Sequence, residues 1–524
     1  MVETEESVAF LVREEGLTLR VFDAFVRGRD GFGLATIVGQ YEGFCEDQYE
    51  VMALAALEAG YENATSWLEA AKGSGCAVCA LSKWEAKNLA IIDAKKKERV
   101  ARQGERLWCT FRDLADEEVR EKQVLALFAP KDFAYKRWGS TFIAECEVPL
   151  DFRERARSGQ VSVSVTSSSS STNLNRMPLR VFEAVGTVDV AACSWASAEA
   201  FLDRDGNWKA QGLENLREWL AAHLAFGIDY FLVMESDATW TDPRESKLWP
   251  VMAPLVESNL AGLVPWPKPA CGARHDGPWA SLQGTQRLAF SAQSFFGRPT
   301  QYAAQNACHR RLRFTAKWVT HLDVDEFAFP GGNFDTLIDA MDSVSHEEKG
   351  RVASVGLPHI FYAPCSTLSE EESQNSPFAE DGPPFCAGKA VPSRVKQIAS
   401  TTDVDYIWDH YVRIRAPGTR LVTASASTGP RLLHARRGYG FSDAASARFA
   451  SVLRKEDLQK TPQETRTFEA KILPRLQLDC STKNNSSFVC GKKQNDSFCW
   501  CRDRDIDRWR PKIADVRRQI WNLL

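Results

Sequence analysis

The 524-residue chain lacks three features that would assign it to an easily recognised class. No stretch reaches the ~20 consecutive apolar residues that a membrane helix requires. The acidic start, MVETEESVAFLVREEG, is unlike the basic and then apolar opening of an export signal. The formal net charge of -4 shows none of the excess positive charge that nucleic-acid-binding surfaces carry. We therefore expect a soluble protein with no membrane segment and no nucleic-acid partner.

The length and composition suit a globular protein of more than one domain. Hydrophobic residues make up 44% and charged residues 26% of the chain, which is ordinary for a folded protein, and domains of about 100 to 200 residues predict two or three units. The serine-rich run SVSVTSSSSSTNLNRMP predicts a flexible linker. The expected order is a mixed α/β accessory region at 1–161, the linker at 162–178, an α/β domain at 179–455, and a cysteine-bearing tail with an amphipathic helix at 456–524.

Cysteines and glycosylation patterns bear on the compartment. Four of the 14 cysteines crowd into the tail, where either disulfides or a small zinc site would account for them: Cys480, Cys490, Cys499 and Cys501. An isolated Cys76-x-x-Cys79 has no second pair at zinc-finger spacing, which favours a structural or incidental role. Asn-x-Ser/Thr tripeptides start at residues 63, 484, 485 and 495. These features favour the secretory pathway, although without an export signal the cytoplasm stays open.

Strand and helix patterns alternate after residue 178, which predicts an α/β fold. VDVAACSW suits a buried strand, and leucines at helical spacing predict a helix from about 213 to Gly227, followed by a strand at 228–234. A basic helix at 302–314 leads into a strand at 318–322. Strands are also expected at 106–111 and 140–150, with a charged helix at 82–107. A stripe of apolar residues from Trp509 to Leu524 predicts a terminal helix that docks on the body.

Acidic residues follow two of these strands. Glu235 and Asp237 follow the first, and Asp323, Asp325 and Glu326 follow the second within KWVTHLDVDEFAFP. Open parallel sheets bind ligands at the carboxyl ends of their strands, and oxygen ligands suit Mg²⁺ or Mn²⁺. Such an ion would neutralise a diphosphate leaving group. On spacing alone, an ordinary acidic turn explains an Asp-x-Asp pattern more often than a metal site does.

Five motifs in order resemble glycosyltransferase family 92. KWVTHLDVDEFAFP resembles the core Asp-x-Asp-Glu-Phe motif of that family, and AAQNACHRRLR resembles its Asn-x-Cys helix. The other three are ENLREWLAAHLAFGIDYFLVMESDAT, SRVKQIASTTDVDYIWDH and LLHARRG. The resemblance covers about residues 188–440. It implies a GT-A (Rossmann-like) nucleotide-sugar-binding domain and an inverting, Mn²⁺- or Mg²⁺-dependent transfer of a sugar, commonly galactose from UDP-galactose, to a glycan acceptor in the Golgi lumen.

The resemblance also implies roles for the residues of the core motif. Asp323 and Asp325 would bind Mn²⁺ and the donor diphosphate, and His434 would complete the metal shell or contact the diphosphate. Glu326 would order the loop or touch the sugar. An inverting transfer also needs a base for the acceptor hydroxyl. Among the acidic candidates on the acceptor side, the first choice is Asp381; the others are Glu380, Asp405 and Asp409.

Further residues would surround the nucleotide. Glu235 and Asp237 would lie near the ribose or base, and Lys396 and Arg436 would offer cations to the phosphates. His410 suits either a site residue or a structural hydrogen-bonding one. Three departures from the family pattern bear on base recognition and sugar choice rather than on the metal. Ser194-Trp195 and an insertion replace the usual Lys-Asn-Glu, glutamate stands at 235 where aspartate is usual, and Ala435 replaces a tyrosine.

Other interpretations stay open at this stage. His223 is expected to be a packed histidine and His321 to face the core, while the basic run at 309–313 is expected to be a solvated helix face. A glycan-binding pseudoenzyme without turnover would keep the same fold. A metal-dependent phosphohydrolase would also need clustered aspartates, although its nucleophile-bearing motifs are not evident.

Overall fold

The structure is a computed structural model. It describes parts of an N-terminal region and of a main body. The described residues are 19–27, 33–41, 107–114, 120–127, 141–167, 177–182, 186–196, 210–236, 238, 240–266, 297–331, 334–348, 350–364, 385–407, 412–425, 429–435, 478–479, 488–493 and 496–521. The expected helix at 82–107 and the Cys76-x-x-Cys79 pair lie outside them. In this part of the chain, no helix is long and apolar enough to cross a membrane.

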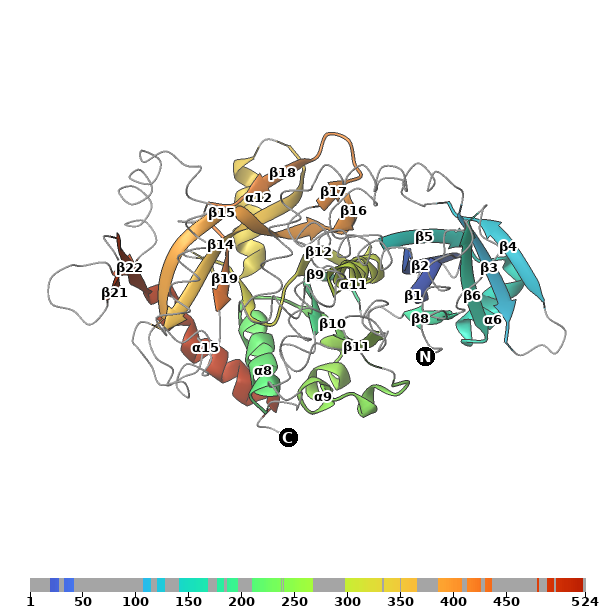
Figure 1. The fold of residues 1–524 in the computed structure, drawn as a ribbon, viewed down its shortest axis with the longest axis horizontal. Helices are drawn as coiled ribbons and strands as arrows, with labels where there is room; N and C mark the ends of the chain where they lie inside the picture. The colour runs from blue at the N-terminus through green and yellow to red at the C-terminus, as the bar shows by residue number, and fades with distance from the viewer. Residues whose placement is uncertain are drawn as a thin grey trace, which may run out of the picture.

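The N-terminal region is a pair of four-stranded sheets (Figure 1). One sheet has the order β5-β2-β1-β8, with bounds Thr141–Glu147, Leu34–Tyr41, Leu19–Arg27 and Arg180–Phe182. The other has the order β4-β3-β6-β7, with bounds Glu121–Leu125, Leu107–Asp113, Val161–Ser167 and Met177–Pro178. Apolar side chains from both sheets form one core, and the Cys109–Cys146 disulfide joins β3 to β5. Strands β3 and β5 confirm the strands expected at 106–111 and 140–150.

The serine-rich stretch is in part a strand, which corrects the linker expected at 162–178. In β6, Val161, Val163 and Val165 are buried in the core between the sheets, and the serines between them occupy the opposite face. The letters VSVSV have the period of two that a strand requires, so the abundance of serine concealed a regular strand. Residues 168–176 lie outside the described residues.

The main body is a mixed sheet whose first four strands are parallel. The order is β11-β10-β9-β12-β15-β14-β19-β13. Strands β9 (Val188–Ala196), β10 (Tyr230–Ser236), β11 (Ala261–Trp266) and β12 (Ala316–His321) run parallel to one another. The sheet continues through β15 (Phe385–Ser400), β14 (Val352–Pro364), β19 (Arg431–Ala435) and β13 (Glu326–Phe329). Strands β14 and β19 are parallel to each other, whereas β15 is antiparallel to β12 and β14, and β13 is antiparallel to β19. The fold is therefore mixed α/β, as expected.

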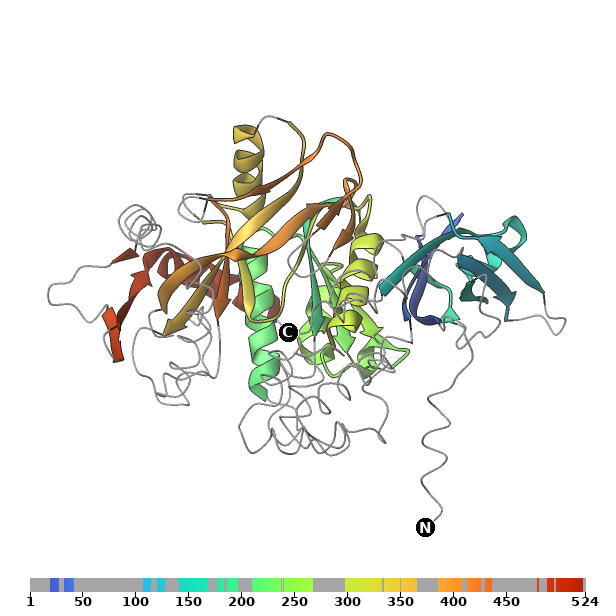
Figure 2. The ribbon, with the colours of Figure 1, turned by 45° about the horizontal axis from the view of Figure 1, so that its top comes forward.

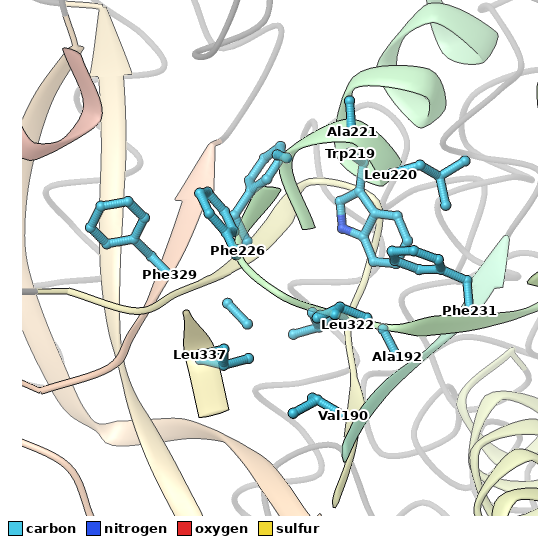
Figure 3. Close-up of a cluster of buried hydrophobic side chains, with 14 of the residues drawn as sticks. Val190, Ala192, Trp219, Leu220, Ala221, Phe226, Phe231, Leu322, Phe329 and Leu337 are labelled. Atoms are coloured by element: carbon cyan, nitrogen blue, oxygen red, sulfur yellow. The ribbon is translucent and has the colours of Figure 1, made fainter. Parts of the chain in front are cut away.

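Helices cover both faces of this sheet (Figure 2). On one face lie α8 (Ala210–Ala225), α9 (Trp249–Glu257), α12 (Leu337–Glu347) and α15 (Arg504–Trp521); on the other lies α11 (Gly297–Leu312). Trp219 and Phe226 from the α8 segment pack among Phe231, Leu322 and Leu337 (Figure 3). The strands and helices expected from the pattern of residues 188–322 are thus confirmed, with boundaries shifted by a few residues.

The end of α8 shows why a glycine follows it. Gly227 has a φ of +86°, and a Cβ atom there would lie 2.8 Å from the Cβ of Thr336. A glycine with positive φ is the usual residue just beyond a helix C-terminus. The close approach of Thr336, the N-cap of α12, excludes any larger residue as well.

The terminal helix docks as its apolar stripe predicts. Trp509 and Ile513 of α15 are buried, and the Trp509 ring packs edge-on against Phe226 at 5.1 Å between ring centroids. Trp521 donates from Nε1 to the carbonyl of Val251 at 2.9 Å. The preceding strands β20 (Leu478–Asp479), β21 (Phe488–Lys493) and β22 (Asp496–Asp503) extend the main sheet through β15. Cys490 and Cys499 occupy facing positions of β21 and β22.

Two further elements complete the described body. Strands β16 (Val404–Ile407) and β17 (Val412–Ile414) form a separate two-stranded sheet beside α11, and β18 (Arg420–Thr423) pairs with β14. A second disulfide, Cys193–Cys308, joins β9 to α11 within the core. This core also includes Phe22, Val38 and Ile143, so the N-terminal region packs directly against α11.

Candidate active site at the strand ends

The carboxyl ends of β9, β10 and β12 lie at one edge of the sheet because the strands are parallel and in register. A small pocket opens at this edge, lined by Cys193, Ser194, Trp195, Met234, Ala304, Gln305, Cys308, His321, Leu322 and Asp323. The buried polar atoms of these residues for which no hydrogen-bond partner is found among the described residues include Ser194 Oγ, Trp195 Nε1 and Gln305 Oε1. Buried polar groups normally find a partner, so this pocket offers donors and acceptors to a ligand.

The turn after β12 is closed by Asp323 and Glu326. The backbone amide of Asp323 donates to Glu326 Oε2 at 3.0 Å, and the amide of Glu326 donates to the Asp323 carbonyl at 3.0 Å. The Asp323 side chain is 42% exposed and accepts from Gln301 Nε2 at 3.1 Å. Gln301 stands near the start of α11, so the helix on one face of the sheet holds the first carboxylate of the turn.

Lys396 lies beneath the carboxylates. Its side chain is 1% exposed, and Nζ lies 3.0 Å from Glu326 Oε2 and 3.5 Å from Asp323 Oδ2. Glu326 is itself buried, and its backbone carbonyl accepts from Trp219 Nε1 at 2.7 Å. A buried ammonium needs a paired carboxylate. In this arrangement Lys396 compensates the charge of Glu326 and part of that of Asp323. The resemblance to the family implied a different role for Lys396, as a cation for the donor phosphates.

Two histidines complete the arrangement from β14 and β19. His434 pairs with Glu326 across β19 and β13, and its Nε2 lies 3.1 Å from Asp325 Oδ2. Its Nδ1 lies 2.6 Å from Nε2 of His359, with the two rings stacked at 4.7 Å. Sequence reasoning missed His359 and Gln301. Neither stands in a recognisable pattern, and the pairing of β14 with β19 is what brings His359 to His434 across 75 residues of chain.

The donor set fits a divalent cation at Asp325 and His434. A carboxylate oxygen and an imidazole nitrogen both suit Mn²⁺. Adjacent ligands of an octahedral ion with bonds of about 2.1 Å lie about 3 Å apart, which matches the 3.1 Å between Asp325 Oδ2 and His434 Nε2. Asp325 is 41% exposed, so solvent reaches the same place. Glu326, His359 and His434 also gather ligand atoms within 4.8 Å of one another on the inner side.

The remaining predicted residues are placed as follows. Glu235 is buried at the end of β10 and accepts from Trp240 Nε1 at 2.7 Å and from Ser246 Oγ at 2.5 Å. Asp405 is buried and pairs with Arg413 at 3.1 Å, which makes it a structural acid. Six residues lie outside the described part of the chain: Asp237, Glu380, Asp381, His410, Arg436 and the acid Asp409.

The basic run at 309–313 is buried, which contradicts the expected solvated helix face. Arg311 forms a bidentate ion pair with Asp23 of β1: Nη1 contacts Oδ2, and Nη2 donates to Oδ1 at 2.9 Å. Arg310 lies 2.9 Å from Glu145 of β5, and Arg313 lies 3.6 Å from the same carboxylate. The acidic partners stand 165 or more residues upstream. The spacing of residues within the helix carries no information about these distant acidic partners. An arginine-rich run by itself therefore suggests exposure to solvent even where its side chains are buried.

His223 is packed, as predicted. Its Nδ1 donates to the carbonyl of Trp219 at 2.8 Å, and its Nε2 accepts from the amide of Ala328 at 3.0 Å. Burial lowers the pKa of His223 to about 3, so the ring is neutral and links α8 to β13. His321 is likewise buried, at 3% exposure.

These features define a mixed α/β protein with carboxylates and histidines gathered at the carboxyl ends of its strands. The family model "Glycosyltransferase family 92" matches residues 207–483, more than half of the chain. The chain belongs to this family and has a role in glycosyl transfer. Among solved structures, mouse xyloside xylosyltransferase 1 in its apo form is similar at 12% identity over 41% of this chain and 67% of that one, with a TM-score of 0.19. No curated protein matches the chain.

Proposed function

We propose that this chain is a metal-dependent, inverting glycosyltransferase with a GT-A arrangement, moving galactose from UDP-galactose to a glycan acceptor. Family membership supports sugar transfer, and the observation that carries the metal dependence is the 3.1 Å approach of Asp325 Oδ2 to His434 Nε2 at the strand ends. The pair joins a carboxylate and an imidazole that are 109 residues apart in the chain.

The three carboxylates of the turn have different roles in this proposal. Asp325 and His434 would hold Mn²⁺, which, when bound, neutralises the charge that develops on the diphosphate leaving group. Asp323 is oriented by Gln301 and Lys396. Its exposed carboxylate is therefore available to accept hydrogen bonds from hydroxyls of the donor. Glu326 is buried on Lys396 and keeps the turn closed.

The strand edge around the small pocket at the end of β9 is where the nucleoside part of the donor would lie. The pocket adjoins Asp323 and carries the unsatisfied atoms Ser194 Oγ, Trp195 Nε1 and Gln305 Oε1. A heterocyclic base with its own donors and acceptors satisfies such groups, whereas an apolar ligand leaves them unpaired. Ser194 and Trp195 replace the usual residues of the family at this point, so the pocket is also where donor choice would differ.

Two parts of the proposal rest on sequence alone or on general chemistry. The acceptor base is proposed as Asp381, which takes the hydroxyl proton while C1 of the sugar is attacked from the face opposite the phosphate. The compartment is proposed as the Golgi lumen. The disulfides Cys109–Cys146 and Cys193–Cys308 support an oxidising compartment, because such bonds persist in secretory proteins and are rare in the cytosol.

The test is a screen of nucleotide sugars for Mn²⁺-dependent release of nucleotide by the full chain, with and without candidate glycans. We expect the fastest release from UDP-galactose, loss of release with chelator, and loss in Asp325→Asn. Asp342→Asn is the matched control, because Asp342 is a half-exposed aspartate that pairs with Lys317 away from the site. Release from no donor, or release that neither chelator nor Asp325→Asn affects, would refute the proposal. Glycan binding without release would favour the pseudoenzyme.

A further inference from the structure

His434 has two neighbours on its inner side, and their distances differ. Nδ1 of His434 lies 2.6 Å from Nε2 of His359 but 3.9 Å from Oε1 of Glu326. Only the first is a hydrogen-bond distance. Glu326 is moreover held by Lys396 on its other oxygen. The partner of the inner nitrogen of His434 is therefore a second histidine and not the nearby carboxylate.

A shared metal ion does not explain the short contact between the two rings. Two ligands of one ion with bonds of about 2.1 Å lie about 3 Å apart or more, whereas these nitrogens are separated by 2.6 Å. A direct hydrogen bond fits that distance. The contact is built into the sheet: His359 faces Leu432 across β14 and β19, which places it diagonally next to His434 on the same face.

The chemistry of a histidine ligand requires such a partner. A ring that binds an ion through one nitrogen must carry its proton on the other, and metal-binding histidines almost always donate that N–H to a fixed acceptor. The usual acceptors are a carboxylate, a backbone carbonyl or water. Here the acceptor in reach of His434 Nδ1 is Nε2 of His359, whose side chain is only 3% exposed and thus held in place.

We propose that His359 is the positioning residue of the cation site: its Nε2 accepts the Nδ1–H of His434 and so presents the Nε2 lone pair of His434 to the cation beside Asp325. This inference rests on the proposed function, since it assumes that His434 is a ligand. His359 itself touches neither cation nor donor. Loss of such a partner typically weakens metal binding about 10- to 100-fold.

The test compares two replacements that differ in one property. His359→Gln places an amide oxygen or nitrogen near the position of the lost Nε2, whereas His359→Phe keeps a ring of similar shape without an acceptor. Binding of MnCl₂ in the presence of UDP is measured by calorimetry and by electron paramagnetic resonance on the full chain. We expect Kd to rise about 10- to 100-fold in His359→Phe and less than about 5-fold in His359→Gln. Nucleotide release at saturating Mn²⁺ should return toward the wild-type kcat in both.

Controls separate the positioning role from its rivals. His309→Gln alters another buried histidine. His309 lies near the C-terminal end of α11 and contacts the Val404 carbonyl of β16, so this variant should leave Mn²⁺ binding unchanged. His434→Ala should abolish Mn²⁺ binding. If His359→Phe does not fold, as judged by thermal unfolding, His359→Asn replaces it, since its shorter amide does not reach the Nε2 position.

The outcomes are distinguishable. Equal Mn²⁺ affinity in wild type and His359→Phe, with binding lost in His434→Ala, would overturn the positioning role and leave the proposed function standing. A His359→Gln variant as weak as His359→Phe would assign His359 to packing alone, which also overturns it. A wild-type chain that binds no Mn²⁺ with UDP would remove the proposed metal site, and the role of His359 with it.

Discussion

Two clusters of buried charge lie at opposite parts of α11, and they serve different purposes. The strand-end cluster consists of Asp323, Asp325, Glu326, Lys396, His359 and His434. The interface cluster consists of Asp23, Glu145, Arg310, Arg311 and Arg313. In the interface cluster every side chain is at most 10% exposed and each acid faces an arginine. The strand-end cluster has three carboxylates and one lysine, which contacts Glu326 and Asp323, and two of the acids are about 40% exposed.

The difference teaches how to separate a site from a structural contact. In the interface cluster three arginines face two acids, but every one of these side chains is buried, so no charge there is open to a ligand. Counted over the carboxylates and the lysine alone, the strand-end cluster keeps an excess of two negative charges, from three carboxylates and one lysine. An uncompensated charge that is open to solvent is the feature that attracts a cation, whereas buried charge by itself indicates little about function.

Helix α11 connects the two clusters. Gln301 near its start donates to Asp323, and Arg310 and Arg311 near its end contact the N-terminal sheet. The nearest of these contacts, at Gln301 and Arg310, are nine positions apart along the helix. Damage to the interface should therefore affect stability first, and damage at the strand ends should affect chemistry first. The following variants test that contrast, from the largest expected effect to the smallest.

Removing one partner of the interface should cost most. Arg311→Met leaves Asp23 buried without its cation, and breaking a buried pair in this way typically costs about 3 to 5 kcal/mol of unfolding free energy. Chemical denaturation measures the loss. The double variant Asp23→Leu/Arg311→Met should recover much of it, because no lone charge remains. A stability loss below about 1 kcal/mol for Arg311→Met would show that the interface cluster is not buried and paired in the way described.

Removing a carboxylate at the strand ends should leave stability nearly unchanged and reduce turnover. Asp325→Asn takes away a proposed cation ligand and also relieves repulsion among the acids. We expect kcat/KM for nucleotide release to fall at least about 100-fold, which is about 2.7 kcal/mol in transition-state free energy. Thermal unfolding should change by only a few degrees. Equal losses of stability and turnover would mean that the two clusters do not differ in kind.

Acid should destabilise the fold through His309, a buried histidine of α11 beside the interface cluster. Burial lowers the pKa of His309 to about 4, while its pKa in the unfolded chain is near 6.5. Between these values the unfolded state binds a proton that the folded state does not, so stability falls as pH drops from about 6.5 toward 4. The loss is about 1 kcal/mol per pH unit. Denaturation at pH 7 and 5 should show a smaller acid-induced loss in His309→Gln than in wild type; parallel curves would contradict this.

An exposed pair supplies the smallest effect. Lys317 and Asp342 lie 3.4 Å apart, and both side chains are about half exposed. Exposed pairs of this kind contribute about 0 to 1 kcal/mol. Lys317→Ala should therefore change the unfolding free energy by less than about 0.5 kcal/mol and leave nucleotide release unchanged. A loss comparable to that of Arg311→Met would show that exposure does not separate the two kinds of contact.

Local patterns predicted the parts of the fold that depend on neighbours in sequence. The leucine spacing of 213–224 identified α8, Gly227 marked its end, and the apolar run before Asp323 identified β12. The acidic turn itself was visible because strand ends of parallel sheets share one edge. The sequence prediction gave Lys396 a role at the donor phosphates, whereas the structure places it buried beside Glu326 and Asp323 of the turn.

The features that the sequence predictions missed or got wrong depend on contacts between segments that are far apart in the chain. His359 lies in a strand with no distinguishing pattern, and its role follows from the pairing of β14 with β19. Arg310 and Arg311 were expected in solvent because their acidic partners belong to another region of the chain. The valines of β6 were overlooked because the serines around them dominated the composition. In each case the missing information was which strands and helices meet, which sequence spacing does not contain.

The positions of the two described disulfides have a consequence for how the chain is made. Cys109 and Cys146 are 37 residues apart, and both precede Cys193, which waits 115 residues for Cys308. The two loops are consecutive and do not interleave. During synthesis from the N-terminus, both cysteines of the first bond emerge before either cysteine of the second, so these two described bonds do not compete with each other for partners. Cys193 meets its native partner only after β10 and β11 have emerged, and the bond to α11 then fixes the first strand of the main sheet.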